Sequence, residues 1–211
     1  MSLFLGKIHY WLFNKIVWFE NLESEIIELA KVEGLDTESL RKVIEGKYGE
    51  RTPNLPLEDM IDTSNIHGWL QGKIHSAEGR MAAWTTEFLK KGDEAKNKLK
   101  DLYEKQGIKA AEELKENGGE AQTAPDLFNA INDYILDGMP CDRVNEVVDS
   151  DENKVTWVRT LCVHKDIWEK ESGDVDFFYH LRSLWVKAFV TNVNEEFEYL
   201  EENESMTIRR K

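Results

Sequence analysis

The residues with the clearest chemical potential in this sequence are a histidine and a glutamate that recur together at a fixed spacing. An Ile-His-x-Trp-Leu-x-x-Lys-Ile-x-x-x-Glu pattern contains His9 and Glu20, and it returns 58 positions later with His67 and Glu78. Imidazole and carboxylate groups on facing helices are ligands that suit zinc, iron or manganese. Because such side chains are seldom buried without a partner, their recurrence beside apolar residues indicates a polar centre.

The direction of each side chain on an ideal helix decides which of these groups can meet. At about 100° per residue, His67 and Glu78 lie within about 20° of each other on one shoulder of the apolar face, but about 16 Å apart along the axis. One helix therefore cannot bring both groups to a single metal ion. If the two matching segments pack antiparallel, each histidine comes level with the glutamate of the other segment. A parallel arrangement instead brings His9 to His67.

Two further histidines are expected on or beside apolar stripes in the C-terminal half. His164 shares a helical face with Trp157 and Trp168, and His180 lies on the shoulder of the last apolar face, whereas His75 points to solvent. The candidate metal ligands are His9, Glu20, His67, Glu78, His164 and His180. A metal site with an open position could activate water or oxygen. The alternative is that each histidine only satisfies a structural hydrogen bond to a glutamate or a backbone carbonyl.

Helices must position these groups, because the chain is rich in Glu, Lys, Leu and Ala and contains only four prolines. The matching segments are residues 7–49 and residues 65–107. Each is expected to form a long helix that ends near a glycine, followed by a more polar helix that ends at Gly49 or Gly107. The first half is therefore predicted to be a duplicated helical hairpin.

Turn-forming residues divide the rest of the chain, and the glycine-rich stretch 117–125 is the best candidate boundary. Three C-terminal helices are predicted, at residues 126–136, 154–170 and 176–202. The sequence thus predicts an all-α fold, a helical bundle in a single domain of residues 1–211. In this bundle the duplicated hairpin is completed by the C-terminal helices of residues 125–204.

Charge and composition narrow the expected partners and location. A net charge of −14, with basic residues scattered among acidic ones, argues against DNA or RNA as a partner. The apolar stretch 3–19 is interrupted by Lys7 and Lys15, which predicts a buried core helix and no membrane span. This apolar N-terminal helix is also a candidate homodimer contact. Cys141 and Cys162 stand outside any Cys-x-x-Cys pair, so reduced thiols and a cytoplasmic location are expected.

Motifs of familiar enzyme classes are missing from the sequence, which has no phosphate-binding glycine loop, serine-nucleophile elbow or His-Glu-x-x-His. Whether the protein is an enzyme is therefore left open. The prediction is a helical bundle that binds a transition metal (zinc, iron or manganese) or a small-molecule ligand at its His/Glu centre. The alternative is a non-enzymatic interaction or scaffold domain whose buried His/Glu pairs are purely structural.

Overall fold

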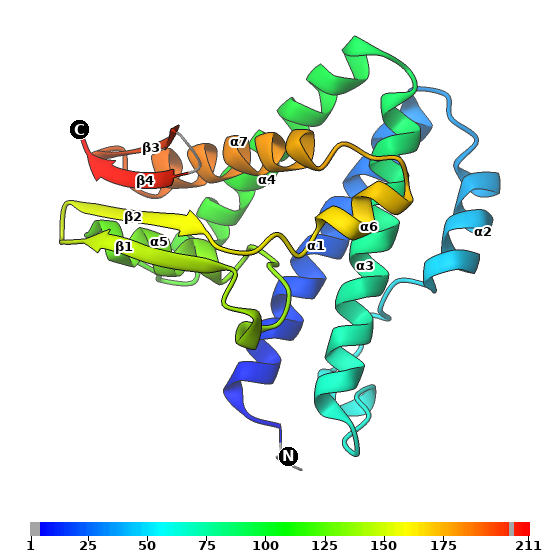
Figure 1. Cartoon of the computed structure of the whole chain (residues 1–211), viewed down its shortest axis with the longest axis horizontal. Helices are drawn as coiled ribbons and strands as arrows, with labels where there is room; N and C mark the ends of the chain where they lie inside the picture. The colour runs from blue at the N-terminus through cyan, green and yellow to red at the C-terminus, as the bar shows by residue number, and fades with distance from the viewer. Residues whose placement is uncertain (1–4, 203–204) are drawn as a thin grey trace.

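Long helices form most of the protein, and a small sheet lies at its C-terminal end (Figure 1). The computed structural model describes residues 5–202 and 205–211. The α-helices are α1 (Lys7–Val32), α2 (Thr37–Tyr48), α3 (Ile66–Leu89), α4 (Asp93–Glu116), α5 (Ala124–Asn132), α6 (Lys165–Lys170) and α7 (Val175–Val193). The strands are β1 (Asn145–Ser150), β2 (Lys154–Arg159), β3 (Phe197–Glu202) and β4 (Ser205–Arg210). Two short 3-10 helices are η1 (Leu57–Asp59) and η2 (Pro140–Asp142).

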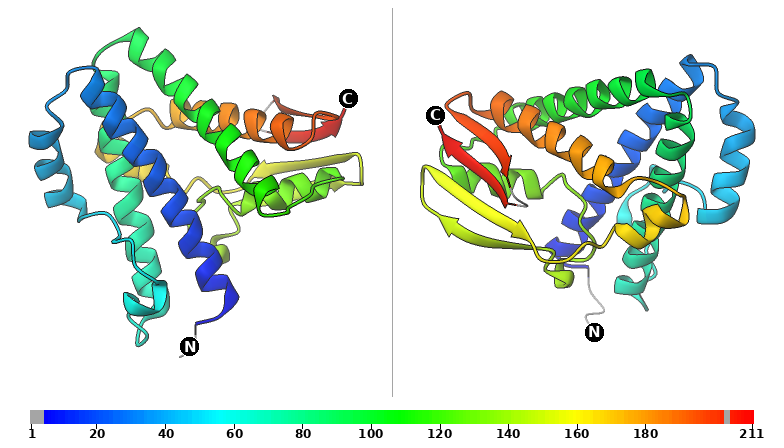
Figure 2. Two further views of the ribbon diagram at one scale, coloured as in Figure 1. Left: turned by 180° about the vertical axis from the view of Figure 1, so that it is seen from behind. Right: turned by 45° about the horizontal axis from the view of Figure 1, so that its top comes forward.

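Helices α1 and α3 lie side by side and run in the same direction (Figures 1 and 2). Residues 58 positions apart are level along the pair. The ring centroids of His9 and His67 are 5.6 Å apart near the start of both helices. Just beyond their other ends, the Lys91 ammonium donates to the Glu33 carbonyl at 2.7 Å. The parallel alternative is therefore the one that the protein adopts.

Polar side chains at several helix starts satisfy the free backbone N–H groups there. The Asp36 carboxylate accepts from the Ser39 N–H before α2, and the Asn65 side chain accepts from the Gly68 N–H before α3. Thr123 caps α5 in the same way. These caps mark where α2, α3 and α5 begin.

A four-stranded antiparallel sheet, in the order β1-β2-β4-β3, covers one side of α5 and α7. Alternate side chains of the strands point into the core, as expected for a sheet with one buried face. The buried residues of β2, β3 and β4 are Val155, Trp157, Phe197, Tyr199, Met206 and Ile208. The sheet thereby completes the core at the end of the molecule away from α2 (Figure 1).

The prediction of an all-α fold is wrong, because four strands occupy much of the C-terminal half. The expected helix 154–170 is β2 followed by a loop and the short α6, and the expected helix 176–202 ends at Val193 and continues as β3. The spacing of Trp157, His164 and Trp168 is helical by coincidence. The alternation of Lys154-Val-Thr-Trp-Val-Arg159 is the pattern that the fold follows.

The second matching segment also departs from its expected end, since α4 passes through Gly107 and continues to Glu116. Helix α4 packs along α7, and this pair is the most extensive helix contact in the fold. At the crossing, a Cβ on Gly107 would lie 2.4 Å from the Trp185 carbonyl oxygen. The glycine is therefore present for close approach of two backbones rather than for a helix end.

Helix α1 is a core helix, with Leu12, Phe13 and Ile16 buried, while Ile8 and Tyr10 near its start remain exposed. In the part of the chain that the structure describes, no helix combines the length and the hydropathy needed to cross a membrane. Homodimer contact through α1 stays a prediction.

Replacing Gly107 with Ala is expected to lower the free energy of unfolding by about 1–3 kcal/mol, because α4 and α7 must separate to admit the methyl group. Gly72→Ala in α3 is the matched control, since its Cβ would meet nothing within 4 Å. That variant is expected to gain about 0.5–1 kcal/mol from its better helix propensity. Urea unfolding of both variants measures the difference, and equal stabilities would contradict the close packing at Gly107.

Candidate functional site

The parallel packing of α1 and α3 separates the predicted His/Glu pairs. His9 does not meet Glu78, and His67 does not meet Glu20. The buried His9 accepts a hydrogen bond on Nδ1 from the Gly6 N–H at 2.9 Å, and its ring lies beside the exposed ring of His67. Glu20 and Glu78 instead contact residues that the repeated pattern did not indicate.

Glu20 is held by Arg80 of α3 in a fully buried ion pair. The Arg80 guanidinium donates to Glu20 Oε1 at 2.6 Å and to Glu23 Oε1 at 2.9 Å, and its remaining donors meet Ser76 and two backbone carbonyls. Thr52 donates its N–H and its hydroxyl to Glu20 as well. This network satisfies every group in it, so it links α1 and α3 and leaves Glu20 no free position for a metal ion.

Glu78 belongs to a second buried network, here called the Arg182 cluster, which consists of Glu78, Asp137, His164 and Arg182. His164 is 0% exposed, and its two ring nitrogens face different acids. Nδ1 lies 3.0 Å from Glu78 Oε1, and Nε2 lies 3.0 Å from Asp137 Oδ1. The first contact is an ion pair without hydrogen-bond alignment, because neither atom has a directed hydrogen-bond partner. The second contact is a hydrogen bond.

Arg182 of α7 closes the cluster from the other side. Its guanidinium pairs with Asp137, donates to the Leu136 carbonyl at 3.0 Å and lies 3.1 Å from His164 Nε2. Among the described residues, no acceptor meets the Nε–H of Arg182. A guanidinium this close to the imidazole also disfavours a metal cation at His164.

The charges of the cluster shift the pKa values of its members. Burial alone would lower the pKa of the His164 imidazole, but the Glu78 carboxylate and the hydrogen bond to Asp137 raise it above its usual value. Burial alone would raise the pKa of the Asp137 carboxyl, but Arg182 and His164 hold it well below its usual range. His164 is therefore the cationic partner of two carboxylates, in competition with Arg182.

Lys15 of α1 is a further buried cation next to this cluster. It is 5% exposed, and its ammonium lies 4.1 Å from the centre of the Trp11 ring. Among the described residues, no carboxylate lies within ion-pair distance of Lys15 and no hydrogen-bond acceptor meets it. Burial lowers the pKa of Lys15 to about 8, with Arg182 also lowering it and Asp137 and Asp133 opposing the shift.

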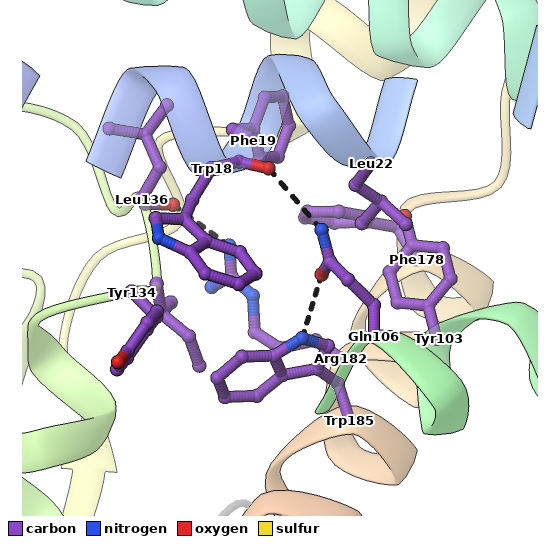
Figure 3. A pocket seen from close by; sticks show the side chains of 11 residues that line it. Trp18, Phe19, Leu22, Tyr103, Gln106, Tyr134, Leu136, Phe178, Arg182 and Trp185 are labelled. Atoms are coloured by element: carbon purple, nitrogen blue, oxygen red, sulfur yellow. Dashed lines mark hydrogen bonds between the residues drawn. The ribbon is translucent and has the colours of Figure 1, made fainter. Parts of the chain in front are cut away.

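A cavity of about 40 Å³ lies between α1, α4, α7 and the segment that follows α5 (Figure 3). Arg182 is part of its wall, and most of the other walls are aromatic or aliphatic. Gln106 braces the cavity, because its amide donates to the Trp18 carbonyl at 3.3 Å and accepts from the Trp185 indole at 2.7 Å. The lining residues are Trp18, Phe19, Leu22, Tyr103, Gln106, Tyr134, Ile135, Leu136, Phe178, Arg182 and Trp185.

Arg182 also lines a second cavity of similar volume on the side of the sheet, together with Arg159 and Tyr179. The Arg159 guanidinium stacks on the Tyr179 ring, and among the described residues it forms no ion pair. The Tyr179 hydroxyl lies 3.2 Å from the free thiol of Cys162. Burial opposes ionisation of this thiol, but Tyr179 and backbone N–H groups at His164 and Lys165 lower its pKa overall.

The predicted metal ligands are thus dispersed. Glu78 and His164 meet each other, Glu20 is bound by Arg80, and His180 is exposed on α7. Within residues 5–202 and 205–211, no three histidine, cysteine, aspartate or glutamate side chains are grouped so that they could hold a metal ion. Metal binding stays a prediction that this arrangement does not favour.

Sequence reasoning missed Lys15, Asp137 and Arg182. Lys15 was visible as a charge inside an apolar stretch, which is a signal of an unusual environment. Arg182 and Asp137 gave no such signal, because their importance comes from meeting His164 across the fold. Comparisons of the chain with protein-family models, with curated proteins and with solved structures gave no match.

The raised pKa of His164 predicts how stability depends on pH. Its favourable interactions are complete below the pKa of an unfolded histidine, about 6.5, and are lost as the pH rises through the higher folded value. The free energy of unfolding should therefore fall more steeply with rising pH above about 6.5 in the wild type than in His164→Gln. Denaturant titrations across this range test the difference, and parallel pH profiles would show that His164 is not charged in the fold.

Proposed function

We propose that this protein binds a small organic anion, a carboxylate, in the cavity of Figure 3, with Arg182 as the group that recognises it. The observation that carries the proposal is the Nε–H of Arg182, which lacks an acceptor among the described residues although the guanidinium lines the cavity. A guanidinium N–H that faces a cavity is free to donate to an acceptor on a ligand. A carboxylate oxygen is the acceptor that fits a guanidinium best.

The balance of buried charge supports an anion as the ligand. Lys15, His164 and Arg182 contribute three cations when ionised, whereas Glu78 and Asp137 contribute two carboxylates. Asp133 also acts on Lys15, but it is exposed and already accepts from the Trp11 indole at 2.7 Å. Buried charges are stable when they are paired, so an additional anion would complete the cluster.

The size and lining of the cavity indicate the kind of anion. One water molecule needs about 10–15 Å³ on this scale, so about 40 Å³ admits a molecule of a few non-hydrogen atoms. Trp18 and Trp185 provide apolar walls. Among the described residues, the hydroxyl of the buried Tyr103 has only the Met81 sulfur, at 3.9 Å, as a weak acceptor. Short carboxylates with an apolar or carbonyl-bearing body fit this combination.

The rival hypothesis is an interaction or scaffold protein in which the Arg182 cluster is purely structural. Hydrogen bonds and ion pairs inside the cluster are compatible with that role. The unmet donor and the adjacent cavity favour ligand binding, because a purely structural network has no need of either.

Titration with propionate and with its uncharged isostere propionamide tests the proposal. Propionate is expected to bind with a Kd of about 1 mM and to raise the unfolding temperature, whereas propionamide should bind at least about tenfold more weakly. Arg182→Gln should weaken propionate binding about tenfold to a hundredfold, since a hydrogen bond to a charged group is lost. Calorimetry or NMR titration gives the dissociation constants.

Arg209→Gln is the matched control, because it removes one arginine charge at an exposed position of β4. Should Arg182→Gln fail to fold, Leu22→Phe fills the cavity from α1 and leaves every charge in place. Equal affinity for propionate and propionamide, or undiminished propionate binding in the Arg182→Gln or Leu22→Phe proteins, would overturn the proposal.

A further inference from the structure

We infer that the carboxylate ligand of this site carries a hydrocarbon tail, which leaves the cavity beside Trp18 and lies in a surface groove along α1. The ligand class is then a medium-chain monocarboxylate, with hexanoate and octanoate as representatives. The inference deepens the proposed function and rests on it, because Arg182 holds the carboxylate. It gives the site a second part, the groove, which recognition of a carboxylate alone does not require.

The exposure of its walls shows where the cavity of Figure 3 opens. The aromatic side chains of the wall are buried except those of Trp18 and Tyr134, which are half-buried. These two rings form an edge-to-face contact with their centroids 4.9 Å apart. Figure 3 shows them next to each other at one side of the cavity. Because solvent reaches both rings, the mouth of the cavity lies beside them.

The same two rings are part of a surface groove that follows α1. The residues that α1 contributes to its lining are Lys7, Tyr10, Trp11, Asn14, Val17 and Trp18. Their spacing places them on one face of the helix, and the helix rises about 16 Å from the first to the last of them. The groove has a volume of about 740 Å³, compared with about 40 Å³ for the cavity. A ligand whose carboxylate occupies the cavity therefore has room in the groove for several methylene groups.

The side chains of the groove favour an apolar tail. Tyr10 is exposed, and Trp11, Val17 and Trp18 are half-buried, so apolar surface along the groove is in contact with water. A hydrocarbon chain that covers this surface removes apolar area from water on both partners. The ammonium over the Trp11 ring, that of Lys15, is buried and does not line the groove.

The charges beside the mouth determine the orientation of the ligand. Glu113 and Asp133 line the groove, and together with burial they raise the pKa of Tyr134 to about 12. A carboxylate is repelled from this negative region and attracted to Arg182 at the inner wall of the cavity. Lys7, the cation of the groove lining, is exposed at the start of α1, about 16 Å along the helix axis from Trp18. The carboxylate therefore points into the cavity and the tail points out.

Titration of the full chain with propionate, hexanoate and octanoate tests the inference. The open groove covers about half of the tail, so each methylene group is expected to lower the Kd about twofold. Hexanoate should then bind about eightfold more tightly than propionate, and octanoate about thirtyfold more tightly. Calorimetry or NMR titration gives the three dissociation constants.

Val17→Asn places a polar side chain in the groove without changing the lining of the cavity. This variant is expected to raise the Kd of octanoate about threefold to fivefold, because apolar contact with the tail is lost, and to leave the Kd of propionate unchanged. Val32→Asn is the matched control, since it makes the same substitution at an exposed position at the end of α1. It should change neither value. If Val17→Asn does not fold, the chain-length series in the wild type still decides the question.

Octanoate binding that is no tighter than propionate binding, or that is unaffected by Val17→Asn, would overturn the inference. Octanoate binding that persists undiminished in Arg182→Gln would overturn it as well, because the tail would then adsorb to the surface without the carboxylate being held. Propionate binding without any dependence on chain length would remove only the tail from the proposal. Absence of propionate binding would remove the proposed function itself.

Discussion

The free-energy cost of burying a charge without a partner determines how the central helix of this protein is packed. Helix α3 carries two such charges, Glu78 and Arg80, and residues two positions apart point to nearly opposite sides of a helix. Arg80 binds the acids of α1, and Glu78 meets His164 at the start of α6. Ion pairs therefore connect α3 to α1 on one side and to the C-terminal half of the chain on the other.

The sequence was sufficient to show that the repeated glutamates avoid solvent, because their direction on a helix follows from residue spacing. The burial of His164 was inferred from a helix over residues 154–170 that the fold does not contain. The sequence was insufficient to show the partners of these groups. A buried carboxylate accepts a guanidinium or an imidazole equally well, and the choice depends on which segment packs against it. The parallel register of α1 and α3 placed Arg80 opposite Glu20, and the segment after α5 brought Asp137 to His164. Neither of these two contacts can be predicted from the spacing of residues along the sequence.

The sheet was missed for a related reason. Aromatic residues of 157–168 fall at helical intervals, and a short strand of six residues gives too few alternations to outweigh that pattern. Tertiary contacts stabilise the strand, because β2 forms backbone hydrogen bonds with both β1 and β4. Its Val155 and Trp157 are buried on the face of the sheet that packs against the helices. Tertiary context of this kind overrides local propensity most readily where the elements are short.

Lys15 and Lys73 show how far tertiary placement can separate two copies of one local pattern. Both follow a tryptophan by four residues and both rest on its ring. The segment after α5 approaches α1, where Asp133 binds Trp11 and Arg182 lies close by, whereas the corresponding side of α3 faces a groove beside the chain after α2. Among the described residues no carboxylate lies within ion-pair distance of Lys15, and burial lowers the pKa of its amine. The surroundings of a lysine at this position therefore depend on the segments that pack over the helix, and not on the local sequence that the two copies share.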